Sequence, residues 1–257
     1  MKTLNTVVIF LAISLTTLVS CKKEKRDANE NLQNNLIKSE VSGDKAVSQY
    51  IYNSTGRIAE IQGFDRYTRY LYDSNGRLAK SESATNQMYS AIASSRTEFM
   101  TSQNSVITSY QIFEYNQTGR LEKVKNYFKE KDEFKLTSTI TFDYEGKNII
   151  KKYMHNAGGA VTHFNNYEYD SRGNVVSEKY YTNFEHPAPK LISETSFKHD
   201  NKNNPLKILE ASGYPGLFTN SNNIIETNLS KTRYEYNGKG FPVKVISDNS
   251  IYEYRYH

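Results

Sequence analysis

The sequence predicts an all-β protein: an antiparallel meander of hairpins whose sheet is strongly twisted and forms a curled sheet or open half-barrel. First, Tyr70–Ala79 reads as strand, turn and strand, and close copies of it recur between residues 50 and 245. Second, the 257 residues include 21 Tyr and no Trp, and many Asn, which suits strands and turns. Third, apolar and polar residues alternate between the copies, as in Leu121–Phe128. A meander of about 15 strands tends to curl.

The local chemistry of Tyr70–Ala79 explains the predicted hairpin. Tyr70 and Tyr72 are two residues apart and share one face of a strand. Asp73–Gly76 suits a type I turn, since Asp accepts a hydrogen bond from the backbone and Gly takes a positive φ. This combination is typical of a three-residue hairpin loop with a bulge. We expect Arg77 to lie opposite Tyr72, with its cation over the ring, a contact of about 0.5–1 kcal/mol, and Leu78 to begin the return strand.

Seven copies of this unit follow one another along the chain. They are Tyr50–Ile58, Tyr70–Leu78, Phe113–Leu121, Phe142–Ile150, Tyr167–Val175, Phe197–Pro205 and Tyr234–Pro242. The fourth is degraded, and in the sixth Asn203 replaces the glycine, as the next best residue for a left-handed position. The chain ends on a half copy, Tyr252–His257, which has no return strand and is expected to leave an edge open for pairing.

The repeated pattern is aromatic-x-Tyr-Asp/Asn-x-x-Gly-Arg-Leu/Ile, and it resembles the YD repeat of the RHS and teneurin family. In the large members of that family, such hairpins spiral into a hollow shell around a toxin or other cargo. The resemblance implies antiparallel β structure here. It does not imply a shell, because seven hairpins are too few to close one.

The N-terminal residues predict export and membrane anchoring. Lys2 precedes an apolar run, Val7–Val19, which is too short to span a membrane and has the layout of a secretory signal. The run ends in Leu18-Val19-Ser20-Cys21, which resembles the lipobox of bacterial lipoproteins. The resemblance implies cleavage before Cys21 and its acylation, by palmitate-like chains that each contribute roughly 0.8 kcal/mol per buried CH₂. By the same resemblance, Lys22 in place of Asp favours the outer membrane, with the leaflet left open.

Three segments are therefore expected: a signal peptide at 1–20, the lipidated Cys21 with a disordered polar tether at 21–45, and a β domain at 46–257. The formal charge of +5 is too weak and too scattered to indicate nucleic-acid binding. A single cysteine excludes an intrachain disulfide.

The sequence offers no strong catalytic or metal-binding motif, and we predict neither catalysis nor a cofactor. It contains no nucleophile elbow and no phosphate-binding glycine loop. His155 and His163 could meet across a hairpin, but two histidines make a poor zinc site. Asp73, Asp170 and Asp200 share one turn position, where a backbone hydrogen bond explains them without chemistry.

The tyrosines admit two interpretations, because their rings can fill a core or stack on sugars and peptides. Their fixed repeat positions favour the core. The irregular segments Tyr180–Phe184 and Tyr214–Phe218 are better candidates for binding, although no ligand-binding residue is assigned. We expect a lipid-anchored envelope protein that acts as a non-catalytic binding or scaffolding module for a polysaccharide or a protein partner. The alternatives are an envelope enzyme that processes glycans and a repeat protein associated with a toxin or cargo.

Overall fold

The computed structural model describes residues 35–85, 98–182, 188–248 and 250–257, which form one antiparallel sheet and one short helix. The elements are β1 (Ile37–Ser42), β2 (Lys45–Tyr52), β3 (Ile58–Gly63), β4 (Arg66–Tyr72), β5 (Leu78–Thr85), β6 (Ser109–Tyr115), β7 (Leu121–Glu130), β8 (Glu133–Glu145), β9 (Asn148–Asn156), β10 (Val161–Tyr169), β11 (Val175–Thr182), β12 (Lys190–Asn203), the 3₁₀ helix η1 (Pro205–Ser212), β13 (Asn222–Thr227), β14 (Thr232–Tyr236), β15 (Pro242–Ser247) and β16 (Ser250–Tyr256).

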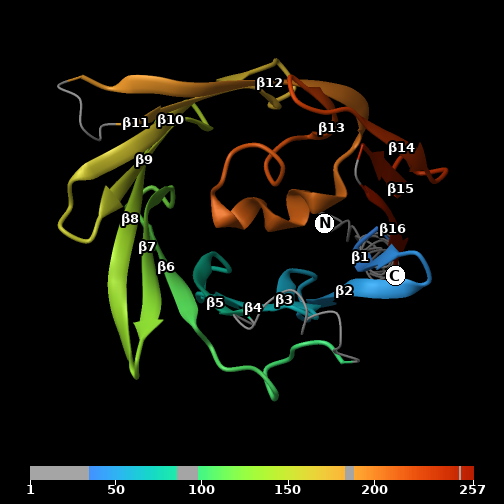
Figure 1. Ribbon diagram of the computed structural model, residues 1–257, viewed down its shortest axis with the longest axis horizontal. Helices are drawn as coiled ribbons and strands as arrows, with labels where there is room; N and C mark the ends of the chain where they lie inside the picture. The colour runs from blue at the N-terminus through green and yellow to red at the C-terminus, as the bar shows by residue number, and fades with distance from the viewer. Residues whose placement is uncertain (1–34, 86–97, 183–187, 249) are drawn as a thin grey trace, which may run out of the picture.

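The 16 strands form a nearly closed ring (Figure 1). Nearly every strand pairs with its neighbours in sequence, and β1 also pairs with β16. The two ends of this sheet, β13 and β14, meet through a single bridge between Glu226 and Lys231. The predicted all-β meander is therefore confirmed, and its sheet curls further than a half-barrel.

The ring closes through two segments for which the sequence predicted another role. Strand β1 lies within residues 21–45, the range expected to be a disordered tether, so the β domain begins at Ile37 rather than at residue 46. The half copy at the C-terminus was expected to leave an open edge, but β16 pairs with β15 on one side and with β1 on the other. Short, partly polar strands such as β1 gain their stability from these partners, not from their own pattern.

The repeat hairpins have the predicted geometry. In the second copy, the Asp73 carbonyl accepts from Gly76 N at 2.9 Å, Asp73 N donates to the Arg77 carbonyl at 2.8 Å, and Gly76 has φ +75°. The ladder shifts register at Tyr72, as a bulge requires. Copies one, three, five and seven have the same glycine conformation and the same pair of backbone bonds.

A second set of bonds joins each copy to the strand before it, and the sequence did not predict them. In the first five copies, the second tyrosine donates its hydroxyl to a backbone carbonyl near the start of the preceding strand, and Tyr256 on β16 does the same, at distances between 2.6 and 2.9 Å. The pairs are Tyr52 with Ile37, Tyr72 with Ile58, Tyr115 with Leu78, Tyr144 with Leu121, Tyr169 with Ile149 and Tyr256 with Pro242.

The arginines of the repeat also act between copies. The prediction that Arg77 lies over Tyr72 was wrong, because the bulge places Leu78 opposite Tyr72. The Arg77 guanidinium instead lies 4.6 Å from the ring centre of Tyr115, in the next copy, while Arg57 occupies that position over Tyr72 at 5.8 Å. Each of the first three copies thus places its arginine over the second tyrosine of the next copy.

The sixth copy does not form a hairpin. Strand β12 continues through Asn203, and the chain then enters η1 at Pro205, whose ring fixes φ and suits the first turn of a helix. The connection of residues 204–221, here called the plug, crosses the interior of the ring before returning along β13 (Figure 1).

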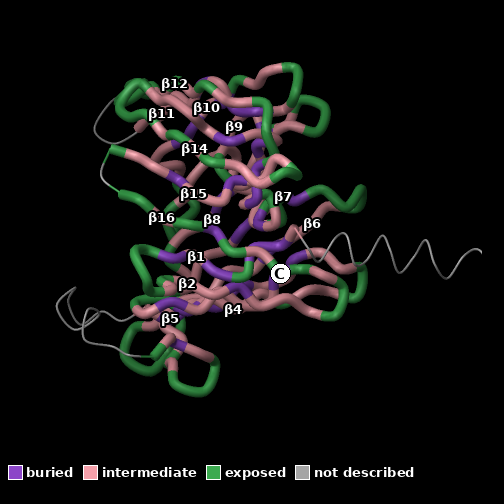
Figure 2. Tube along the Cα trace, turned by 90° about the vertical axis from the view of Figure 1, so that its right-hand side faces the viewer, coloured by how far each residue is buried: buried purple, intermediate pink, exposed green. Residues whose placement is uncertain are grey.

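The plug is fixed by buried contacts. Leu209 is buried against Ile37, Ile58 and Val245 from the inner face of the sheet. The side chain of Asn204 accepts from Leu206 N and donates to the carbonyls of Leu217 and Asn220. In Figure 2 the buried positions lie along the strands, whereas the exposed positions gather at the turns. The main core therefore lies inside the ring, between the plug and the sheet, and a smaller cluster of Tyr67, Ala84 and Met100 is buried on the outer face of β4 and β5.

Candidate functional site

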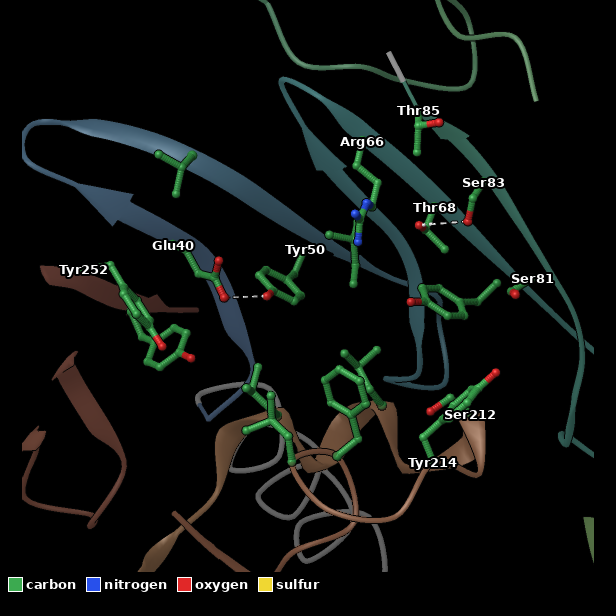
Figure 3. A pocket seen from close by; sticks show the side chains of 18 of the residues that line it. Glu40, Tyr50, Arg66, Thr68, Ser81, Ser83, Thr85, Ser212, Tyr214 and Tyr252 are labelled. Atoms are coloured by element: carbon green, nitrogen blue, oxygen red, sulfur yellow. Dashed lines mark hydrogen bonds between the residues drawn. The ribbon is translucent and has the colours of Figure 1, made fainter. Parts of the chain in front are cut away.

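The interior of the ring contains a cavity of about 810 Å³, here called the central cavity. One wall is the inner face of β1 to β6 and β16, and the other is the plug (Figure 3). It reaches the end of the ring at Ser42, Thr85 and Ser250, which adjoin the turns opposite the repeat turns. A cavity of this size accommodates a small organic ligand.

The wall of the central cavity on β4 to β6 is rich in hydroxyl groups. Thr68 and Ser83 face each other across two strands, with their oxygens 3.2 Å apart (Figure 3). Ser81 donates to the side-chain oxygen of Gln111 at 3.0 Å. Alternating residues of β5, at positions 81, 83 and 85, place their hydroxyls on this one face.

Gln111 joins the sheet to the plug at this wall. Its amide nitrogen donates to Asn126 at 2.8 Å and to the Tyr214 hydroxyl at 3.0 Å. Because one amide serves two partners on different elements, it fixes the position of Tyr214 against the cavity.

Tyrosines supply the aromatic surface of the cavity. Burial raises the pKa of Tyr50, Tyr214, Tyr252 and Tyr254 above the ordinary value for tyrosine. Their hydroxyls therefore stay protonated at physiological pH. They offer a neutral ring face with a hydrogen-bonding tip, which suits a ligand that is itself polar but uncharged.

The cavity wall contains one carboxylate and one guanidinium among the described residues, from Glu40 and Arg66. The Glu40 carboxylate accepts from the Tyr50 hydroxyl at 2.7 Å (Figure 3), and it also accepts from the Ser48 hydroxyl at 2.9 Å. Glycoside hydrolysis by the usual route uses two carboxyl groups. The described wall thus supplies binding groups but not that pair.

The two segments singled out from the sequence lie in different places. Tyr214, Leu217 and Phe218 belong to the plug and line the central cavity. In the other segment, Tyr180 and Tyr181 lie on β11, where Tyr181 stacks on Phe164 with ring centres 4.8 Å apart, away from the cavity. Asn183 and Phe184 lie outside the described residues.

The histidines do not converge. His155 pairs with Val161 in the ladder, and its ring contacts Thr141 and the Gly159 carbonyl. His163 pairs with Met154 instead. Within the described ranges, no cluster of three or more His, Cys, Asp or Glu residues is placed to hold a metal ion.

The turn aspartates have the structural partners expected for them. Asp73 accepts from the backbone nitrogens of Asn75 and Arg77, and Asp170 accepts from those of Arg172 and Asn174.

Asp200 also makes the predicted local bond, since its carboxylate accepts from the backbone nitrogen of Lys202 at 2.9 Å. In addition, the Asn223 side chain and the Tyr236 hydroxyl donate to the same carboxylate, so that Asp200 also joins strands. Cys21, the predicted lipid-attachment residue, lies outside the described residues.

Sequence reasoning missed the hydroxyl-rich wall. The signal was present in Ser81-Glu82-Ser83-Ala84-Thr85, where hydroxyl residues alternate at the period of a strand. It was missed because nothing local shows that this face looks into a cavity.

A smaller cavity of about 380 Å³ lies between the plug and the repeat turns. Four of its lining residues are cationic, namely Arg120, Lys147, Arg172 and Lys207, and Glu210 is its one carboxylate. The plug thus separates two interior spaces of different chemistry.

Comparisons with known proteins give only distant likenesses. No family model matches the sequence, and no curated protein matches it. A porin-like protein from Bacteroides uniformis superposes with a TM-score of 0.37 and 12% identity, over 82% of this chain and 95% of that one. A porin-like protein from Bacteroides vulgatus gives 0.34 and 10%, over 86% and 98%. The TcdB2–TccC3–Cdc42 structure gives 0.26 and 13%, over 81% of this chain but 13% of that one.

These values assign no family, so the function has to be argued from the residues of the chain itself. Among the described residues, the structure contains no helix with the length and apolar character needed to cross a bilayer.

Proposed function

We propose that the chain is a lipid-anchored protein of the bacterial envelope and that its ring is a non-catalytic binding module. Its ligand is a polysaccharide segment held in the central cavity. The residues before and at Cys21 support the anchoring, through their likeness to a lipobox. The repeat hairpins support a relationship to YD-repeat proteins, because the same turn and the same tyrosine bond recur from copy to copy.

One observation carries the choice of ligand: the wall of the central cavity combines hydroxyls with protonated tyrosines. Sugars present hydroxyl groups around a ring whose C–H face is apolar, and aromatic side chains with nearby donors and acceptors complement both parts. Thr68 and Ser83 lie across the cavity from Tyr214 on the plug (Figure 3). A ring in this space has polar partners on one side and an aromatic face on the other.

The charges of the described wall support binding without turnover. Glu40 is engaged by Tyr50 and Ser48, and the described wall offers no second carboxylate to act as acid or nucleophile. The alternative, an enzyme that cleaves envelope glycans, uses such a pair in the usual route.

The test uses a chain that lacks residues 1–20, carries Cys21→Ser and keeps β1. This chain is passed over immobilised envelope polysaccharides, and both its retention and the formation of new reducing ends are measured. Retention without cleavage is expected. Cleavage of the polysaccharide would replace the proposal with the enzyme alternative, and absence of both would refute it.

A matched pair of variants on β4 tests the place of binding. Thr68→Phe fills part of the central cavity, whereas Leu71→Phe adds bulk at an exposed position of the same strand. Retention is expected to fall at least tenfold for the first and to stay within twofold for the second, if a filled cavity costs more than about 1.4 kcal/mol of binding free energy. Equal retention of both variants would place the ligand elsewhere.

Anchoring is tested separately. In the native host, the full chain is expected in the membrane fraction after washing without detergent, and the Cys21→Ser chain is expected to be released. A Cys21→Ser chain that stays in the membrane fraction would contradict acylation as the anchor.

A further inference from the structure

The two ends of the ring carry opposite charge. The repeat turns at residues 53–57, 73–77, 116–120, 146–147, 170–174 and 237–241 lie at one end, here called the repeat rim. These turns carry six cationic side chains and two carboxylates. The cations are Arg57, Arg77, Arg120, Lys147, Arg172 and Lys239.

The opposite rim has the reverse balance. Its described connections, within 43–44, 64–65, 98–108, 131–132, 157–160, 188–189, 228–231 and at 248, hold five carboxylates and two cations. The carboxylates are Asp44, Asp65, Glu98, Asp132 and Asp248, and the cations are Lys131 and Lys231. Since successive turns of a meander alternate between the two ends, the charge difference runs along the axis of the ring.

Most of the cations on the repeat rim are available to a partner. Its two carboxylates, Asp73 and Asp170, are engaged within their own turns, by Arg77 at 2.8 Å and by Arg172 at 3.5 Å. The other four cations, Arg57, Arg120, Lys147 and Lys239, are exposed and form no salt bridge with the described residues. The guanidinium of Arg120 is held at this rim by the Gly146 carbonyl at 2.8 Å and the Tyr144 ring.

The chain reaches the ring at this same rim. The carbonyl of Ile37, which begins β1, accepts from the Tyr52 hydroxyl beside the first repeat turn, and the Leu36 carbonyl accepts from His257 N. Fifteen residues separate Cys21 from Ile37, and they include Lys22, Lys23, Lys25 and Arg26. Even fully extended, such a segment spans at most about 55 Å.

We propose that the repeat rim docks on an anionic membrane surface, so that the ring stands on the bilayer and the central cavity opens away from it. The choice of a membrane as the partner rests on the proposed anchoring at Cys21. The positive charge of the repeat rim is independent of that proposal. Lipid phosphates attract the four unpaired cations, and the acyl chains hold this rim rather than the acidic one near the headgroups. The plug then lies between the bilayer and the central cavity.

The experiment measures how strongly the repeat rim binds to lipid vesicles in a chain that lacks the acyl anchor. The chain that lacks residues 1–20 and carries Cys21→Ser is sedimented with vesicles of phosphatidylcholine alone or of phosphatidylcholine with phosphatidylglycerol, at low and high salt. Binding is expected only with phosphatidylglycerol, and it should weaken as salt rises.

Two double variants, each of which removes two positive charges, distinguish binding by the repeat rim from an effect of the net charge of the chain. Lys147→Gln with Lys239→Gln is expected to lower the partition coefficient by roughly 25-fold, fivefold for each cation removed near the surface. Lys131→Gln with Lys231→Gln, on the opposite rim, should change it less than twofold. All four positions are exposed, and circular dichroism checks that each variant keeps its strands.

The proposal would be overturned if the two double variants lowered the partition coefficient equally. It would also be overturned if the chain bound to vesicles that contain only phosphatidylcholine. Neither result bears on the retention of polysaccharide or on the release of the Cys21→Ser chain in the host. Failure of this proposal is therefore distinguishable from failure of the proposed function.

Discussion

Substitution of Gly213 tests how closely the plug packs against the sheet. Gly213 caps η1 with φ +72°, and a Cβ built on it would lie 2.2 Å from Cδ2 of Leu121. In Gly213→Ala, the left-handed conformation costs about 1–2 kcal/mol, and displacing the buried Leu121 side chain costs roughly 1–3 kcal/mol more. We expect a loss of about 2–5 kcal/mol in the free energy of unfolding, measured by urea denaturation at constant m-value.

Gly173→Ala is the matched control, because Gly173 has φ +85° and open space where its Cβ would lie. It should lose only the backbone term, about 1–2 kcal/mol. In a Leu121→Ala background, the cost of Gly213→Ala should fall to that same value, since the clashing methyl group is gone. If Gly213→Ala and Gly173→Ala lose equal stability, the plug does not contact the sheet as described.

Three further changes probe the repeat and the core. Tyr115→Phe removes the hydroxyl that donates to the Leu78 carbonyl at 2.9 Å, and should destabilise the fold by about 1 kcal/mol in urea unfolding; no loss would mean that water replaces the bond. Leu209→Ala, at a residue 7% exposed, should cost about 2–5 kcal/mol and make the plug more sensitive to proteolysis; intact resistance would contradict a plug held by this residue. Burial lowers the pKa of His199, which contacts Asn220; the unfolded chain therefore takes up the proton first, and stability is complete above about pH 6.5 and declines below it. His199→Gln should flatten that decline, and an unchanged pH profile would assign it to other groups.

The hairpins were predictable because their chemistry is local. An Asx residue three positions before a glycine suits this turn by its own chemistry, and the structure repeats the bonds of Asp73 and Gly76 in the copy at Asn116 and Gly119. The inward placement of the paired aromatics follows from strand alternation, and Tyr50 is buried as that pattern predicts.

The closure of the ring was not predictable, because it depends on partners far away in sequence. Strand β1 has a polar composition, and it closes the ring through its ladder with β16, which runs from Ile37 with Tyr256 to Val41 with Glu253. The same holds for the stacking of Arg77 on Tyr115, which joins residues in separate copies.

The central cavity could not be predicted from the sequence for the same reason. The sequence favoured the Tyr214–Phe218 segment only as an irregular loop, and nothing in it shows that Pro205 turns the chain inward. The place of Tyr214 on the cavity depends on Gln111, which lies 103 positions away.

Sugar binding in the central cavity can be measured by fluorescence, because the chain contains no Trp. Thr85→Trp, in the chain without residues 1–20 and with Cys21→Ser, places a single indole at the mouth of the central cavity. Titration with envelope oligosaccharides is expected to give a saturable change in its emission, which the added change Thr68→Phe removes and which Leu71→Trp, on the outside of the ring, does not show. An oligosaccharide that is retained by the Thr85→Trp chain but leaves the emission of its indole unchanged would contradict the account.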